Sequence, residues 1–117
     1  MRALVTDDDA IVLESCKRIL EADCFEVVLS SSVADALRIL EDEEFDLVIV
    51  DVIMPENDGF YLMKMTKTKW PDIPIIAMSG FPTPEVIERG RSIGAARFIS
   101  KPFNPDEFLA AVRSVLG

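Results

Sequence analysis

The stretch Leu47-Val48-Ile49-Val50-Asp51 decides the fold, because four consecutive aliphatic residues run directly into an aspartate. A strand with one face in water alternates apolar and polar residues, whereas a strand of a parallel sheet is covered by helices on both faces. A continuous apolar run therefore predicts a buried strand of a parallel sheet. The carboxylate lies where that strand ends.

Similar runs recur along the chain and alternate with helical patterns. Together with 47–50, the predicted strands are 3–6, 25–29, 75–78 and 97–99. Strict alternation of strands and helices is typical of a doubly wound α/β domain with right-handed crossovers. We predict one flavodoxin-like domain over residues 1–117, with a five-stranded parallel sheet in the order 2-1-3-4-5 and five helices. No repeat, low-complexity tract or linker divides it.

Capping residues mark three of the expected helix starts. Residues 32–35 (Ser-Val-Ala-Asp) resemble a capping box. Thr83 and Asn104 each precede a proline, the pattern of an N-cap followed by the first helical residue. The fourth helix is expected over 84–92 and the fifth over 105–116.

Composition excludes several classes of function. Acidic residues outnumber Lys and Arg by 21 to 12, and the net charge of −9 disfavours direct binding to nucleic acid. No apolar run of about 18 residues is present, so we expect no membrane span. Three aspartates follow Met1 too soon for a signal-peptide core, which favours a cytoplasmic location. Histidine is absent, so chemistry that needs imidazole must come from a partner.

The two cysteines give no sign of a metal site. Cys16 shares a helical face with Leu13 and Leu20 and is predicted to be a small buried hydrophobic residue. Cys24 is expected in a loop. A disulfide is not expected in a reducing compartment.

Polar residues gather at the predicted strand ends. The triplet 7–9 (Asp-Asp-Asp) follows strand one, Asp51 strand three, Ser79 strand four, and Ser100 and Lys101 strand five. The carboxyl ends of parallel strands meet at one edge of a sheet, where ligands bind. The order 2-1-3-4-5 would place these four strands side by side.

Each of these residues also has a simpler interpretation. The triplet 7–9 could cap the first helix, Asp51 and Ser79 could be turn residues, and Lys101 could be a solvated loop lysine. Their common position at strand ends favours one shared site.

The carboxylates of Asp7, Asp8 and Asp51 would face the single ammonium of Lys101. Without a cation, their repulsion would raise at least one pKa and destabilise the fold. A ligand set made only of oxygen selects a hard ion, and Mg²⁺ binds through carboxylates, waters and substrate phosphate. Ca²⁺ and Mn²⁺ use the same ligand types and stay open as alternatives.

Four segments, in this order and spacing, resemble the receiver domain of two-component response regulators. They are LVTDDD (4–9), DVIMPENDG (51–59), SG (79–80) and GAARFISKPF (94–103). The resemblance spans essentially the whole chain.

The resemblance implies a role for each acidic residue. Asp51 is the phosphoacceptor in a phosphorelay. Asp7 and Asp8 form the acidic pair that organises Mg²⁺, with further ligands from Asp51 and the backbone carbonyl of Ile53. This interpretation requires Asp51 to lie near Asp8 and Lys101 and to be open to solvent, and a structure in which Asp51 is far from them or buried would contradict it.

The resemblance also implies how the signal is formed. The hydroxyl of Ser79 binds the phosphoryl oxygens, and Lys101 pairs with the carboxylate before phosphorylation and with the phosphoryl group after it. Phe98 is the switch aromatic, which moves inward as Ser79 shifts. The bond between Lys101 and Pro102 is implied to be cis.

Partners follow from the same resemblance. The phosphoryl donor is a phosphohistidine on a sensor histidine kinase or a histidine phosphotransfer protein, and acetyl phosphate is a possible small donor. The output face comprises 84–92, 97–99 and 105–116, and it contacts a downstream effector protein or domain, or a second copy in a homodimer. No nucleic acid or membrane partner is expected. The domain is a signalling switch rather than an enzyme that acts on an external substrate.

Two positions depart from the common pattern of the family, and two others bear on how long a phosphoryl group would last. Phe98 stands where many family members carry tyrosine, and Thr6 replaces an aliphatic residue. Ile53 and Phe81 would flank the phosphoryl group, and neither side chain can orient an attacking water. Slow self-dephosphorylation is therefore predicted.

Three rival functions share part of this pattern. Hydrolases that form an aspartyl phosphate resemble Asp-x-Asp, with the second carboxylate as general acid, but Ile53 occupies that position here. A degenerate receiver would bind proteins without being phosphorylated, which the complete set of site residues disfavours. A flavodoxin-like cofactor binder is disfavoured because an acidic pocket repels a flavin phosphate.

Overall fold

The computed structural model describes residues 1–54 and 57–117. Pro55 and Glu56, which belong to the segment 51–59 quoted above, lie outside the described residues.

The central feature is a parallel sheet of five strands in the order β2-β1-β3-β6-β7. Its strands are β1 (Arg2–Thr6), β2 (Glu26–Ser30), β3 (Leu47–Asp51), β6 (Ile75–Ser79) and β7 (Arg97–Ser100). This is the predicted order, since β6 and β7 are the fourth and fifth of the expected strands. Two short strands after β3, β4 (Ile53–Met54) and β5 (Asn57–Asp58), form a separate antiparallel pair.

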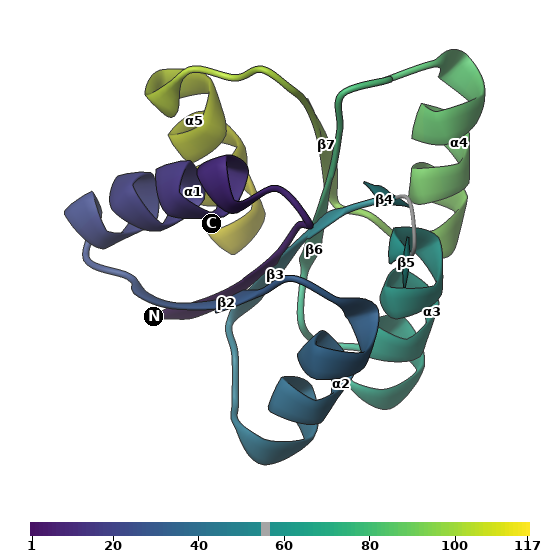
Figure 1. Cartoon of the computed structure of the whole chain (residues 1–117), viewed down its shortest axis with the longest axis horizontal. Coiled ribbons are helices and arrows are strands. Elements are labelled where there is room, and N and C mark those ends of the chain that lie inside the picture. Colours follow the sequence, from purple (N-terminus) through teal and green to yellow (C-terminus); the bar gives the residue numbers. More distant parts are fainter. Residues whose placement is uncertain (55–56) are drawn as a thin grey trace.

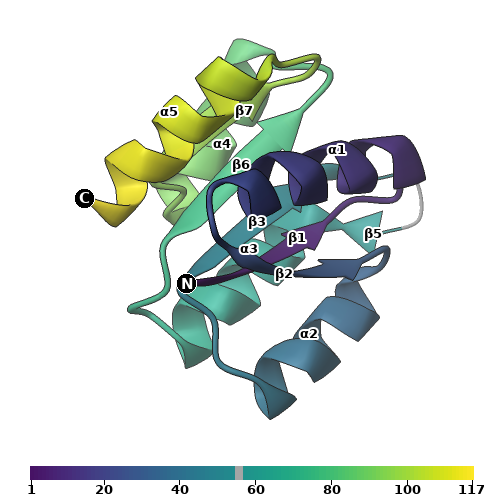
Figure 2. The same cartoon turned by 90° about the vertical axis from the view of Figure 1, so that its left-hand side faces the viewer.

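Five helices cover the two faces of the sheet (Figures 1 and 2). They are α1 (Ala10–Ala22), α2 (Val33–Asp42), α3 (Gly59–Lys69), α4 (Pro84–Ile93) and α5 (Pro105–Leu116). In Figure 1, α1 and α5 lie on one side of the sheet, and α2, α3 and α4 lie on the other. The doubly wound arrangement is therefore confirmed.

The apolar runs fill two cores, one on each face. In β3, Leu47 and Ile49 pack with α1 and α5, whereas Val48 and Val50 pack with the other three helices. All four side chains are fully buried. Covering both faces explains why this strand shows no polar alternation.

The capping residues act as the sequence predicts. Ser32, Thr83 and Asn104 each accept a hydrogen bond from a backbone N–H in the first turn of the helix that follows. Such a cap typically stabilises a helix by about 1 kcal/mol. The fifth helix has the predicted bounds, and α4 ends at Ile93, one residue later than expected.

The cysteines also lie where they were predicted. Cys16 is buried in the core beneath α1 and α5, and Cys24 is exposed between α1 and β2. Both are free thiols. Over the described residues, the structure has no helix with the length and apolar character needed to cross a bilayer.

Candidate functional site

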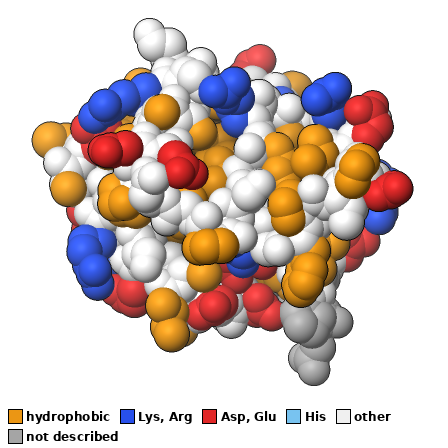
Figure 3. Space-filling model, turned by 90° about the horizontal axis from the view of Figure 1, so that it is seen from above, with side chains coloured by type: hydrophobic (Ala, Val, Ile, Leu, Met, Phe, Trp, Pro, Cys, Tyr) orange, Lys and Arg blue, Asp and Glu red, His pale blue; other side chains and the backbone are white. Residues whose placement is uncertain are grey.

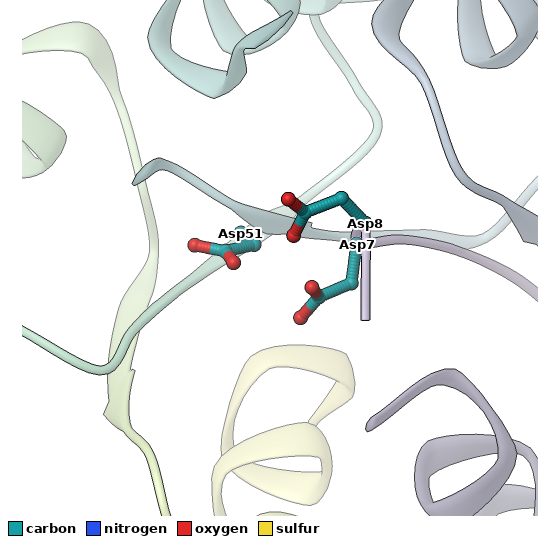
Figure 4. A group of neighbouring side chains, drawn as sticks. All are labelled: Asp7, Asp8 and Asp51. Atoms are coloured by element: carbon teal, nitrogen blue, oxygen red, sulfur yellow. The ribbon is translucent and has the colours of Figure 1, made fainter. Parts of the chain in front are cut away.

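The predicted site residues meet at the carboxyl-terminal edge of the sheet. Asp7 directly follows β1, and Lys101 directly follows β7. Asp51 and Ser79 are the last residues of β3 and β6, rather than the residues after them. Figure 4 shows the carboxylates of Asp7, Asp8 and Asp51 gathered around one point.

Lys101 joins two of the carboxylates. Its Nζ donates to Asp7 Oδ2 and to Asp51 Oδ2, each at 2.9 Å. Its backbone N–H donates to the carbonyl of Ser79 at 2.8 Å, and its bond to Pro102 is cis. Residues about 50 and 94 positions apart in sequence are thereby held in contact.

The second oxygen of each buried carboxylate is bonded to a backbone amide. Asp51 Oδ1 accepts the N–H of Ile53 at 3.0 Å, and Asp7 Oδ1 accepts the N–H of Asp9 at 3.0 Å. Asp9 in turn caps α1 by accepting the N–H of Ile11. The capping interpretation of the triplet 7–9 is thus confirmed for Asp9, whereas the role of Asp7 and Asp8 in a site stays a prediction.

Asp51 is much less exposed than a reactive acceptor was expected to be. Its fractional exposure is 3%, although Asp8 beside it is exposed. Lys101, which follows β7, donates a hydrogen bond to one of its oxygens, and the amide of Ile53 donates to the other. The Lys101 side chain is itself 16% exposed, so the carboxylate is covered by one side chain at the edge of the domain.

Burial and neighbouring charges shift the pKa values of three groups in the site. Burial raises the pKa of Asp7, and the charge of Asp51 raises it further. The pKa of Asp8 is also raised, by desolvation first and then by its hydrogen bond to Asp7 and the charge of Asp7. Desolvation works against the ammonium of Lys101, but its bonds to Asp51 and Asp7 outweigh this and raise its pKa. One lysine does not balance three carboxylates.

The site fits a hard divalent cation. Oxygen atoms of Asp7, Asp8 and Asp51 lie within 4.8 Å of one another. Within the described residues, no other cluster of three or more His, Cys, Asp or Glu side chains has a geometry that could hold a metal ion. Carboxylate oxygens and an exposed approach are what Mg²⁺ requires, since it keeps several waters. A role for the carbonyl of Ile53 stays a prediction.

Ser79 and Phe98 occupy the predicted neighbourhood. Ser79 is fully buried, and its Oγ accepts the N–H of Phe81 at 2.9 Å, which leaves the hydroxyl proton available to another acceptor. Phe98 is half-buried in β7 and packs against the core on the side of α4. Their roles in binding and switching stay predictions.

Gly59 is a site residue whose role the sequence reasoning missed. A Cβ built on Gly59 would lie 2.1 Å from the carbonyl oxygen of Asp51 and 2.6 Å from Cα of Val52. Helix α3 therefore begins in direct contact with the end of β3. The sequence signal that could have predicted this helix start is Asp58 followed by Gly59, ahead of a helical pattern. Asp58 caps helix α3 in the structure.

Thr6 adds one unexplained feature beneath the site. It is fully buried at the end of β1. Its hydroxyl oxygen, Oγ1, is buried and has no hydrogen-bond partner within the described residues. Nothing in the structure explains why a hydroxyl replaces an aliphatic group there.

Comparison with known proteins agrees with this geometry. The sequence matches the family described as response regulator receiver domain over residues 3–113. The chain belongs to this family. It is therefore a receiver domain of the kind found in the response regulators of two-component systems.

Two curated relatives illustrate the similarity. This receiver domain is 34% identical over 113 residues to the heme response regulator HssR of Staphylococcus saprophyticus, covering 97% of this chain and 50% of the relative. It is 32% identical over 116 residues to the response regulator MprA of Mycobacterium avium, covering 99% and 51%. The chain thus spans about half the length of these relatives.

Solved structures of receiver domains share the fold. A CheY-like receiver domain protein from Methanospirillum hungatei superposes with a TM-score of 0.93 at 30% identity, covering 98% of this chain and 92% of the other. The non-phosphorylated HemR receiver domain from Leptospira biflexa gives 0.91 at 33% identity, covering 99% and 94%.

Proposed function

We propose that this receiver domain accepts a phosphoryl group on Asp51 from a phosphohistidine of a sensor histidine kinase or a histidine phosphotransfer protein. The observation that carries the proposal is the contact of Asp51 with Lys101 at 2.9 Å, beside the carboxylates of Asp7 and Asp8. We also propose that residues 1–117 act as one unit, in the cytoplasm.

The transfer requires little from the protein beyond position and charge. A carboxylate oxygen of Asp51 forms the new bond to phosphorus while the bond from phosphorus to the imidazole nitrogen breaks and its electron pair stays on the imidazole. The N–H of Ile53, at 3.0 Å from Asp51 Oδ1, orients the nucleophile. Lys101 and the hydroxyl of Ser79 then bind oxygens of the transferred group.

The residues present would hold Mg²⁺ through Asp7, Asp8, Asp51 and the carbonyl of Ile53. When bound there, the ion supplies positive charge that offsets the charge on the phosphoryl oxygens. The closeness of the three carboxylates supports this assignment, since their oxygen atoms lie within 4.8 Å of one another.

The low exposure of Asp51 makes Lys101 part of the mechanism. Its ammonium covers Asp51 Oδ2, so a donor reaches that oxygen when the lysine moves aside. The bond to Asp7 at 2.9 Å gives the ammonium a partner while it leaves Asp51. Lys101 then pairs with the transferred group.

The signal would be read on the face formed by α4, β7 and α5. Phe98 of β7 lies against α4, since a Cβ built on Gly90 would be 3.4 Å from its ring. A shift of Ser79 toward the phosphoryl group would draw this ring inward and bias a two-state equilibrium. A downstream effector or a second copy would bind the favoured state.

The side of the molecule on which α4 and α5 begin carries both apolar and charged side chains (Figures 1 and 3). Figure 3 looks onto the molecule from above the view of Figure 1 and shows apolar side chains scattered among polar and charged ones on this side of the molecule. Lys and Arg side chains lie along its upper edge, with acidic side chains among the apolar ones.

The alternative function is a degenerate receiver that binds proteins without phosphorylation. The complete set of contacts around Asp51 argues against it. Turnover of an external phosphate ester is disfavoured because Ile53 offers an apolar side chain, 42% exposed, where a hydrolase has its general acid. We therefore propose a switch rather than a hydrolase.

Intact-mass measurement after incubation with acetyl phosphate and Mg²⁺ tests the proposal. The wild type is expected to gain the mass of one phosphoryl group, and Asp51→Ala is expected to gain none. Asp72→Ala, which removes an exposed loop carboxylate, serves as the matched control and is expected to behave as wild type. No wild-type adduct with acetyl phosphate or with a phosphorylated histidine kinase would establish the degenerate receiver instead.

A further inference from the structure

A groove of about 710 Å³ lies at the amino-terminal edge of the sheet, opposite the edge that carries Asp51. It is formed by the start of β1, the end of α2 with the loop after it, and the end of α3 with the loop after that helix. Its apolar lining consists of Leu40, Phe45, Trp70 and Ile73. A volume of this size holds several side chains of a partner.

The rim of this groove is strongly acidic. Its carboxylates come from Glu41, Asp42, Glu43, Glu44 and Asp46, and Arg2 is the basic residue among the described residues that line it. Helix α2 ends here without a basic residue in its last turn, so the negative end of its dipole adds to the potential. The groove therefore attracts positive charge.

Two cations of the chain itself lie on the aromatic rings of this groove. The guanidinium of Arg2 lies 5.0 Å from the centre of the Phe45 ring and pairs with Glu26 and Glu43. The ammonium of Lys69 lies 5.7 Å from the centre of the Trp70 ring. Each aromatic ring of the groove thus holds a cation on its face, the geometry of a cation–π contact.

A carboxylate accompanies each of these cations. Lys69 pairs with Glu41 at 2.6 Å, as Arg2 pairs with Glu43. Glu44 is exposed and has no ion-pair partner within the described part of the chain, and Asp42 reaches Arg38 only at 3.9 Å. These two carboxylates remain available to an incoming cation.

We propose that this groove docks a basic segment of a partner protein, with Arg or Lys residues separated by aliphatic ones. The cationic groups would bind the free carboxylates of Asp42 and Glu44, and an aliphatic side chain would enter the apolar lining. Charge complementarity decides the occupant, because nucleic acid and anionic membranes are repelled by the same rim. The proposal is independent of phosphoryl transfer at Asp51.

Trp70 provides the assay, since it is the sole tryptophan of the chain. Its fluorescence is titrated with a nine-residue synthetic peptide that alternates Arg and Leu and contains no aromatic residue. We expect a saturable change that weakens as salt rises. No saturable change in low-salt buffer would overturn the proposal.

A charge reversal locates the contact. Glu44→Lys is expected to weaken peptide binding by about fivefold, the scale of an exposed ion pair. Glu14→Lys makes the same charge change at an exposed position of α1, on the opposite face of the sheet, and is expected to leave affinity within about twofold. Equal weakening by both variants would show an unspecific response to net charge and would overturn the proposal.

Removing one of the chain's own cations from the groove is expected to strengthen peptide binding. Lys69→Ala uncovers Trp70 and frees Glu41, so the peptide is expected to bind about two- to fivefold more tightly. Arg18→Ala removes one positive charge from an exposed site on α1 and is the matched control. Equal tightening in both variants would count against a defined groove.

Two further measurements separate other occupants. Spermidine that reproduced the peptide's saturation and its dependence on Glu44 would overturn a peptide segment in favour of free polyamines. Concentration-dependent self-association of the chain, abolished by Glu44→Lys, would overturn it in favour of a second copy. Asp51→Ala is expected to retain peptide binding, so failure at this groove and failure of phosphoryl transfer are distinguished.

Discussion

Gly59→Ala is expected to disturb both stability and phosphoryl acceptance, because there is no space for a side chain at this position. The added Cβ would lie 2.1 Å from the carbonyl oxygen of Asp51, and real Cβ atoms essentially never approach closer than 3.0 Å. The start of α3 and the end of β3 must therefore separate by about 0.9 Å, the difference between these two distances. The atoms in the way belong to the backbone and cannot rotate aside.

The size of the effect follows from two opposing contributions. Alanine is better than glycine in a helix by about 0.5–1 kcal/mol. Overpacking typically costs about 1–3 kcal/mol, and a clash with rigid backbone belongs at the upper end. We expect a net loss of about 1–2 kcal/mol in the free energy of unfolding.

Urea denaturation measures this loss as a lower midpoint with an unchanged slope. Gly80→Ala is the control for stability, because a Cβ there meets nothing within 4 Å. The displacement of β3 also moves Asp51, and a misplacement of about 1 Å can slow a positioned reaction on the order of 100-fold. The rate of adduct formation with acetyl phosphate reports this. A Gly59→Ala protein with wild-type midpoint and rate would refute the close-packing argument.

Three other outcomes can be measured. Folding raises the pKa of Asp8 above 3.8, so the ionisation of this carboxyl lowers the stability of the protein as pH rises through the folded-state pKa. In the presence of a chelator at pH 7, Asp8→Asn should therefore melt at a higher temperature than the wild type, and this gain should vanish below about pH 4. Added Mg²⁺ should stabilise only the wild type. Ellman's reagent should label only Cys24 in the native protein and both thiols in denaturant, because burial raises the pKa of Cys16 to about 12; two fast native thiols would contradict this burial. The double variant Ile53→Asn, Phe81→Glu should shorten the phosphoryl half-life, since both native side chains are apolar and exposed, and equal half-lives would discard the shielding hypothesis.

Much of the fold could be predicted from the chain alone, because its signals are local. The uninterrupted apolar run 47–50 indicates burial on both faces, and the structure covers it on both faces. Caps at Ser32, Thr83 and Asn104 act within one helical turn of their own position. The gathering of Asp51 and Lys101 at one edge follows from the rule that parallel strands end together.

Tertiary structure decided what depends on packing between distant segments. It divided the triplet 7–9 between a helix cap at Asp9 and a buried ion pair at Asp7. It covered Asp51 to 3% exposure, against expectation, and placed Gly59 against its carbonyl. Hydrophobic periodicity and helix capping depend on neighbours within a few residues, so strands, helices and caps can be predicted from the sequence. Exposure and the space around an atom depend on side chains brought in from other strands and helices, and only the packed molecule determines them.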